Sequence, residues 1–164
     1  MSLYLKQLTV NDGVEVFNML KGILPVENSF TNPVFNMSFI EFKNWLVQQD
    51  DWSKEKNLPE GYVGQTIFWL MNDDSPVGIG KIRHLLTPQS RLNGGNIGYA
   101  ISSDHRGKGY GNEILRLLLE QAAIMKIKEI MLTVDKYNYA SKSVIEKNGG
   151  ILFDENEERW YFRF

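Results

Sequence analysis

Cysteine is absent from the 164-residue sequence, and histidine occurs only twice. The absence of cysteine excludes disulfides, thiol catalysis and cysteine-ligated metal sites, and it suits a reducing compartment such as the cytoplasm. Two histidines are too few for a multi-histidine metal centre. We therefore expect a cytoplasmic protein whose chemistry needs no metal ion.

The sequence also has no long apolar run and little net charge. No window approaches the roughly 20 apolar residues that a membrane-spanning helix requires. The first residues, MSLYLKQLTVND, carry neither a basic start nor a long apolar segment, so we expect no signal peptide. A formal net charge of −2 predicts no attraction of the whole protein to nucleic acid or to a membrane surface.

Short periodic segments, separated by turn residues, make up the rest of the sequence. The length and a hydrophobic content of 43% predict one globular domain, residues 1–164. Apolar alternation and short apolar runs predict strands at 3–8, 66–72, 77–85, 96–101, 128–134, 151–153 and 159–164. Helical spacing predicts helices at 11–22, after Ser38, at 112–126 and at 138–150, with Asn11 or Asp12, Ser38 and Asn138 as caps. Segments 23–37, 50–64 and 87–95 are expected to be irregular. This order predicts an α/β or α+β domain with a mixed sheet.

A glycine-rich loop joins a predicted strand to a predicted long helix. Gly107, Gly109 and Gly111 alternate with other residues directly after Arg106. Glycines let the backbone approach a ligand closely, and a helix start offers unpaired N–H groups to an anion. The ligand expected here is a phosphate or pyrophosphate. The spacing fits neither a P-loop, which needs G-x-x-x-x-G-K-[ST], nor a dinucleotide G-x-G-x-x-G fingerprint.

The pattern that remains, Arg106-x-x-Gly109-x-Gly111, resembles the signature of the GNAT superfamily of acyl-CoA-dependent N-acyltransferases, and of an uncharacterised bacterial acetyltransferase subgroup within it. The preceding GGNIGYAI and the following VDKYNYASKSVIEKNGG strengthen the resemblance. It implies a twisted mixed sheet splayed between its fourth and fifth strands, with acetyl-CoA as co-substrate. It also implies direct transfer of the acetyl group to a primary amine.

The resemblance further implies which residues hold the co-substrate. The loop would cradle the pyrophosphate, the strand before it would lie along the pantetheine arm, and the N–H of Ile101 would stabilise the oxyanion. Asn138 would reach the pantetheine and Ser141 the thiol end, although a plain helix cap and an exposed helix serine explain these two residues equally simply. The implied cofactor-binding residues are Ala100, Ile101, Arg106, Gly107, Lys108, Gly109, Tyr110, Gly111, Asn112, Asn138 and Ser141.

Two departures from the family pattern affect catalysis. Many members carry a glutamate base where this chain has Asn96, and a tyrosine acid where it has Ile145. We expect Glu27 to replace the base and Tyr139 to replace the acid. Tyr99, His84 and His105 are weaker candidates that core, strand-end or bystander roles also explain. A non-catalytic acyl-CoA-binding module and a nucleotide-phosphate enzyme therefore stay open as alternatives.

The acceptor amine cannot be read from the sequence, and the resemblance admits a homodimer. Several aromatic residues are expected either to line an acceptor pocket or to pack in the core. These residues are Phe30, Phe35, Phe39, Phe42 and Trp45. The helical spacing of Phe39 and Phe42 favours the core for these two.

Overall fold

The computed structural model describes residues 2–164. In chain order it contains β1 (Leu3–Gln7), α1 (Val14–Lys21), β2 (Val26–Glu27), β3 (Phe30–Thr31), a 3₁₀ helix (Pro33–Asn36), α2 (Phe39–Ser53), β4 (Gln65–Asn72), β5 (Ser75–Arg83), α3 (Pro88–Leu92), β6 (Ile97–Ile101), a second 3₁₀ helix (Ser103–His105), α4 (Tyr110–Ile124), β7 (Met131–Asp135), α5 (Tyr139–Lys147), β8 (Ile151–Glu155) and β9 (Arg159–Arg163).

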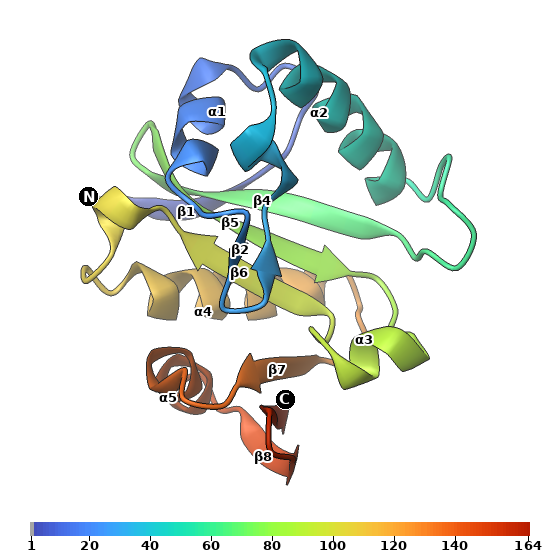
Figure 1. Ribbon diagram of the computed structural model, residues 1–164, viewed down its shortest axis with the longest axis vertical. Helices are drawn as coiled ribbons and strands as arrows, with labels where there is room; N and C mark the ends of the chain where they lie inside the picture. The colour runs from blue at the N-terminus through green and yellow to red at the C-terminus, as the bar shows by residue number, and fades with distance from the viewer. Residues whose placement is uncertain (1) are drawn as a thin grey trace.

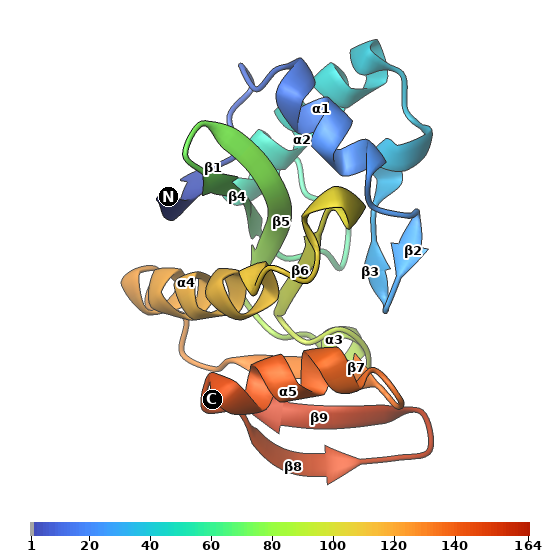
Figure 2. The same ribbon diagram turned by 90° about the vertical axis from the view of Figure 1, so that its left-hand side faces the viewer.

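The larger strands form two sheets that diverge from a common edge. One sheet has the order β1-β4-β5-β6 and the other β7-β9-β8, and all neighbours within each are antiparallel. β2 and β3 pair with each other as a separate short ribbon. Figure 2 shows β6 and β7 at the boundary between the two sheets, with the β2–β3 ribbon beside them. The predicted splay between the fourth and fifth long strands is confirmed.

Helices cover both faces of the first sheet. Figures 1 and 2 show α1 and α2 on one face, α4 on the other between the two sheets, and α5 against the second sheet. The β4 sequence explains this arrangement, because its apolar residues do not alternate with polar ones. Trp69 packs with α1 and α2, whereas its neighbours Phe68 and Leu70 pack in the cluster that contains α4. Each face of β4 is therefore the floor of a separate core.

The first helix does not begin as the sequence predicts. Neither Asn11 nor Asp12 caps it; the N-cap is Gly13, which makes no side-chain capping bond. The Asp12 side chain is buried instead, and it accepts a hydrogen bond from the Trp69 indole Nε1 at 2.7 Å. A tertiary contact thus takes the carboxylate that local capping rules assign to the helix. The caps predicted at Ser38 and Asn138 are confirmed.

Other differences lie at boundaries and in the segments expected to be irregular. Segment 23–37 contains the β2–β3 ribbon and a 3₁₀ helix, and segment 87–95 contains α3. Helix α2 continues to Ser53, into the region predicted as loop, and β7 starts at Met131 rather than at residue 128. The β2–β3 ribbon, the 3₁₀ helix and α3 have too few residues to show a period, so only their tertiary packing defines them.

Asn96 joins the two sheets at the point where they diverge. Its backbone N–H donates to the Met131 carbonyl (2.9 Å), its Oδ1 accepts from the Met131 N–H (2.9 Å), and its Nδ2 donates to the Glu129 carbonyl (2.7 Å). The residue is 1% exposed. Gly95, at φ +61°, allows this close approach, because a Cβ there would lie 2.0 Å from the Met131 carbonyl oxygen. The asparagine at the family's glutamate position therefore has a structural task.

We predict that Asn96→Ala destabilises the protein by roughly 2–4 kcal/mol, because the buried Met131 N–H and the partly buried Glu129 carbonyl lose their partners. Urea unfolding measures the change, and Asn11→Ala is the control, since Asn11 is exposed and its side chain makes no hydrogen bond in the described chain. Equal stability of the two variants would contradict the role of Asn96 as the joint between the sheets.

Candidate functional site

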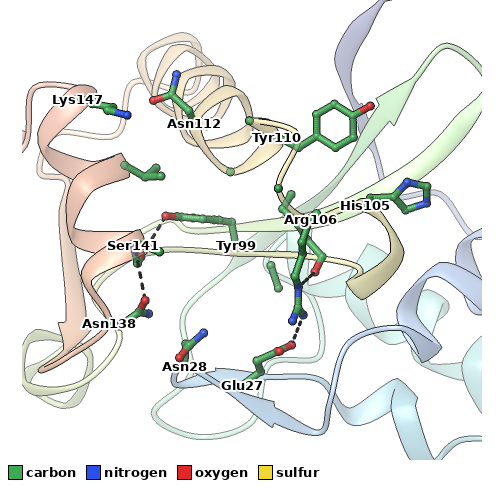
Figure 3. A pocket seen from close by; sticks show the side chains of 17 residues that line it. Glu27, Asn28, Tyr99, His105, Arg106, Tyr110, Asn112, Asn138, Ser141 and Lys147 are labelled. Atoms are coloured by element: carbon green, nitrogen blue, oxygen red, sulfur yellow. Dashed lines mark hydrogen bonds and ion pairs between the residues drawn. The ribbon is translucent and has the colours of Figure 1, made fainter.

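A cavity of about 440 Å³ opens between β6, the glycine loop, the start of α4, α5 and the β2 end (Figure 3). Its lining residues are Glu27, Asn28, Tyr99, Ala100, Ile101, His105, Arg106, Gly107, Gly109, Tyr110, Gly111, Asn112, Asn138, Ala140, Ser141, Val144 and Lys147. Most of the residues that the resemblance implies for acetyl-CoA thus border one space. Asn28, Ala140, Val144 and Lys147 also border it, and the sequence analysis did not identify them.

Backbone donors without partners line the loop side of the cavity. Gly107 and Gly109 have φ values of +74° and +82°, and a Cβ on either would meet nothing within 4 Å. Gly109 is the N-cap of α4 and supplies no side-chain cap. Within residues 2–164 the N–H groups of Gly107, Gly109, Gly111 and Asn112 donate no hydrogen bond. Unpaired N–H groups at a helix start are the expected partners of a bound anion.

The Arg106 side chain takes a direction that the sequence does not predict. Its Nε donates to the Ile101 carbonyl at 3.0 Å, and its terminal nitrogen pairs with the Glu27 carboxylate at 2.6 Å. Figure 3 shows the guanidinium pointing to β2, away from the start of α4. The groups available to an anion at this loop are therefore backbone N–H groups, and Arg106 holds the loop between two elements. Glu27, predicted as the general base, is engaged in this ion pair.

β6 exposes one edge of its backbone beside the cavity. Among the strands of residues 2–164 it pairs only with β5, with Gly78 opposite Ile101, and the next residue, Ser102, donates its N–H to the Val77 carbonyl. Hydrogen-bonded pairs alternate in an antiparallel ladder, so Ile101 lies at a non-hydrogen-bonded position and directs its N–H to the open edge. Tyr99, two residues earlier, does the same. This geometry supports the predicted oxyanion role of Ile101.

The opposite wall is α5, where one predicted residue lies outside the cavity. Asn138 caps the helix by accepting from the Ser141 N–H at 3.3 Å, which confirms the predicted cap. It also lines the cavity, and its contact with the pantetheine stays a prediction. Tyr139 is largely exposed, and its ring packs on Trp160 with 5.5 Å between centroids. Tyr139 thus does not line the cavity, and its predicted role as the acid stays a prediction that this geometry does not favour.

Tyr99 extends from β6 to the α5 wall. Its hydroxyl and the Ser141 hydroxyl are 3.1 Å apart and share a hydrogen bond (Figure 3). Burial raises the pKa of Tyr99, so the phenol stays protonated at neutral pH. Ser141 is one helical turn before Ile145, the position where many family members carry a tyrosine. The Tyr99 hydroxyl therefore lies one turn from that position.

Three of the residues predicted to bind acetyl-CoA have side chains that lie outside the cavity or are held by other contacts. Lys108 does not line the cavity. The Tyr110 ring is buried in the core and accepts from the Asn72 amide at 3.1 Å, so it borders the cavity through its backbone (Figure 3). The Asn112 side chain accepts from Asn148 at 3.0 Å and ties α4 to α5.

A second cavity of about 110 Å³ lies between the β2–β3 ribbon, β5 and the diverging strands β6 and β7. It shares Asn28, Tyr99 and Ser141 with the first cavity. Lys81 and Arg83 of β5 also line it. Burial lowers the pKa of Lys81 to about 8, with the charge of Arg83 adding to the effect, and burial lowers the pKa of Arg83 as well.

The remaining candidates have structural surroundings. His84 lies outside both cavities, and its ring nitrogens contact Thr66 Oγ1 (2.8 Å) and Glu55 Oε1 (3.2 Å). His105 borders the first cavity and Phe30 the second. Phe35, Phe39, Phe42 and Trp45 line neither, and the last two belong to the core with α1.

Across residues 2–164, no three acidic, histidine or cysteine side chains gather where they could ligate a metal ion, and no helix there has the length and apolar character to cross a membrane.

We predict that the stability difference between Lys81→Met and the wild type changes between about pH 8 and 10.5. The unfolded chain keeps Lys81 protonated up to its ordinary pKa of 10.5, whereas the folded protein releases that proton near 8. The unfolded state therefore binds more protons in this range, and the wild type gains up to about 3 kcal/mol relative to the variant.

Urea unfolding of both proteins across this range measures the change. The other titratable or charged groups that line the Lys81 cavity are Arg83 and Tyr99, and both stay in the variant. A constant difference between the proteins would contradict a desolvated Lys81 ammonium.

Comparison with known proteins places this arrangement in a family. The model of the acetyltransferase (GNAT) domain matches residues 3–151. The ribosomal-protein-S5-alanine acetyltransferase from Vibrio fischeri matches with a TM-score of 0.76 and 16% identity, over 100% of this chain and 93% of that one. RimL, a ribosomal L7/L12 alpha-N-protein acetyltransferase solved with coenzyme A, gives 0.74 and 14%, over 100% and 94%.

The microcin C7 self-immunity acetyltransferase MccE, solved with acetyl-CoA and AMP, gives a TM-score of 0.70 and 13% identity, over 99% of this chain and 91% of that one. No curated protein matches the sequence. At these identities the solved structures establish the fold, and the domain model, which covers most of the chain, establishes the family. This chain belongs to the GNAT acetyltransferase family.

Proposed function

We propose that this protein transfers the acetyl group of acetyl-CoA to a primary amine. The observation that carries the proposal is the row of unpaired backbone N–H groups at the start of α4, which faces a cavity that continues along the open edge of β6. The family and the acetyl-CoA or coenzyme A named for two similar structures support it. A non-catalytic acyl-CoA binder is the alternative that the experiments below distinguish.

The cavity suits the different parts of acetyl-CoA. Loop residues 107–112 would hold the pyrophosphate through N–H groups, and exposed Lys147 adds a cation that forms no ion pair in the described chain. The open edge of β6 would pair with the pantetheine amides, with Asn138 on the opposite wall. The Ile101 N–H would then lie beside the thioester carbonyl, where a negative charge develops during attack.

The reaction forms one C–N bond and breaks one C–S bond. The neutral amine attacks the thioester carbonyl carbon, the tetrahedral oxyanion collapses, and the coenzyme A thiolate leaves. The amine nitrogen gives up a proton and the thiolate takes one. Glu27 is the only carboxylate among the described residues that line the two cavities, and it is paired with Arg106, so we propose that the amine proton leaves to water.

We propose Tyr99 as the acid that protonates the thiolate. Its phenol is kept protonated by burial and is positioned by Ser141. It thereby takes the place that Ile145 cannot fill. A thiol with a pKa near ~8.5 leaves with modest help, so the contribution of the acid is small compared with that of oxyanion donors.

Three further points extend the same proposal. Residues 1–164 form one GNAT domain, the protein works in the cytoplasm, and its acetyl transfer requires no metal ion. The homodimer admitted by the resemblance stays a prediction. RimL and the S5-alanine enzyme are named for protein acceptors and MccE for microcin self-immunity, so family membership leaves the acceptor of this chain to be identified.

Gly109→Val should weaken acetyl-CoA binding about 100-fold or more, because a β-branched residue disfavours the positive φ and obstructs several charged hydrogen bonds. Gly61→Val is a matched control, because Gly61 has φ +81° and, like Gly109, open space around its Cβ position, but does not line the cavity. Thermal-shift titration measures affinity, and a ligand at 100 times its Kd stabilises the wild type by about 2.7 kcal/mol. Equal losses in both variants would contradict a specific role of the loop.

Tyr99→Phe should lower kcat about 10-fold and leave the KM for acetyl-CoA nearly unchanged, as expected for loss of a general acid. Coenzyme A release with an amine panel measures the rate, and Tyr139→Phe serves as the control outside the cavity. A slow Tyr139→Phe beside a normal Tyr99→Phe would reverse the assignment. Binding of acetyl-CoA without release for any amine would favour the non-catalytic module.

A further inference from the structure

We propose that the second cavity binds a carboxylate group of the acceptor, so that the substrates are primary amines that carry a carboxylate, as amino acids do. The inference rests on the proposed acetyl transfer and specifies its acceptor. It stands on the two cations that line this cavity, Lys81 and Arg83, and on the three lining residues that the cavity shares with the neighbouring acetyl-CoA cavity.

Neither cation is neutralised by the protein. Lys81 Nζ donates to the Thr31 carbonyl at 3.3 Å and lies 4.6 Å from the centre of the Phe30 ring. Arg83 donates to the Gly95 carbonyl at 2.8 Å. In the described chain neither forms an ion pair with a carboxylate.

The acidic groups nearby have partners of their own. Asp135 pairs with Arg159 at 3.0 Å and accepts from Ser29 at 2.7 Å. Glu27 pairs with Arg106 at 2.6 Å. These carboxylates therefore do not compensate the two positive charges of Lys81 and Arg83.

Such a surplus has a cost that a structural role does not explain. Removing an ammonium and a guanidinium from water is unfavourable unless an opposite charge compensates, and apolar residues of similar volume usually serve stability better. Two cations on the same face of one strand, two residues apart, also repel each other. A bound anion removes both penalties, and arginine and lysine are the usual partners of a carboxylate.

The position of the cavity connects this charge to the reaction. Asn28, Tyr99 and Ser141 line both cavities, so the two cavities adjoin at the Tyr99–Ser141 pair that bridges β6 and α5. An acceptor whose carboxylate lies at Lys81 and Arg83 would therefore enter from the side opposite acetyl-CoA. Its amine would point to the open edge of β6, where the Ile101 N–H would hold the thioester carbonyl.

The same charge selects against other amines. A polyamine would bring additional positive charge beside two unpaired cations, which costs Coulomb energy in a poorly solvated space. An amine with a carboxylate brings the compensating charge itself. The positive surroundings also favour loss of the amine proton, which the attack requires.

The test compares L-amino acids with their amides as acceptors for the acetyl-CoA-loaded protein. The amide keeps the amine and the shape but lacks the negative charge. The amine of the amide is also less basic, so a larger fraction of it is neutral and reactive at neutral pH. A higher rate with the acid would therefore reflect recognition of the carboxylate and not amine protonation. We expect kcat/KM to be about 10- to 100-fold higher for the acids, the range of charged hydrogen bonds.

Three variants assign the preference to the cavity. Lys81→Met and Arg83→Met should each remove most of the preference while the thermal shift caused by acetyl-CoA stays as in the wild type. Lys81→Gln repeats the test with a polar side chain. Lys128→Met is the control, because Lys128 is exposed and lines neither cavity. Wild-type preference in the cavity variants would overturn the proposal.

The outcomes separate this proposal from the proposed function. Equal rates with acids and amides, or faster rates with spermidine, would overturn the carboxylate site and leave acetyl transfer standing. Faster rates with phosphoethanolamine than with the amino acids would replace the carboxylate by a phosphate and also overturn it. Absence of turnover with every amine would refute the acetyl transfer. The site is then tested by NMR titration of the coenzyme A-loaded protein with N-acetyl amino acids and their amides, where equal affinities overturn it.

Discussion

A strand with a neighbour on only one side keeps a row of N–H and C=O groups that must find hydrogen bonds elsewhere, and β6 is such a strand in the middle of this protein. The two sheets touch at Asn96 and diverge beyond it, so the groups of Tyr99 and Ile101 have no strand to pair with. The same lack of partners continues into the glycine loop and the start of α4. Almost everything assigned to the site depends on this opening, because a ligand that binds there completes a ladder that the fold leaves incomplete.

Hydrogen bonds of single side chains keep the opening in shape. Asn96 fixes its closed end, and Arg106 fixes the loop to the Ile101 carbonyl and to β2 through Glu27. Tyr99 and Ser141 join its two walls. The charges nearby follow a consistent division: Glu27 and Asp135 are paired, whereas Lys81 and Arg83 have no counter-ion among the residues that the structure describes. That division gives the two sides of the opening different electrostatic characters, with backbone donors for a phosphate on one side and side-chain cations on the other.

The order of the long elements could be predicted from the sequence, since each has a period or a run long enough to recognise. The strands around β4 and β5, the long helix after the glycine loop and the caps at Ser38 and Asn138 depend on local patterns. The β2–β3 ribbon and α3 could not be predicted, because they owe their form to packing against distant strands. The Asp12 prediction failed for a related reason: the Trp69 indole, 57 positions away, provides a buried partner that outweighs local capping.

The candidate site divides in the same way. The glycine spacing and its place between a strand and a helix were enough to locate a loop with positive φ and unpaired N–H groups, since backbone conformation there follows from residue type. Side-chain directions were not accessible, because they depend on which residue of a distant element comes within reach. Arg106 turns to Glu27, Tyr139 turns to Trp160, and Tyr99 reaches Ser141. Residue types and their spacing were therefore sufficient for the family, the order of the long elements and the position of the glycine loop. Which side chains meet across the opening depends on the folded chain, because those contacts join residues that are far apart in sequence.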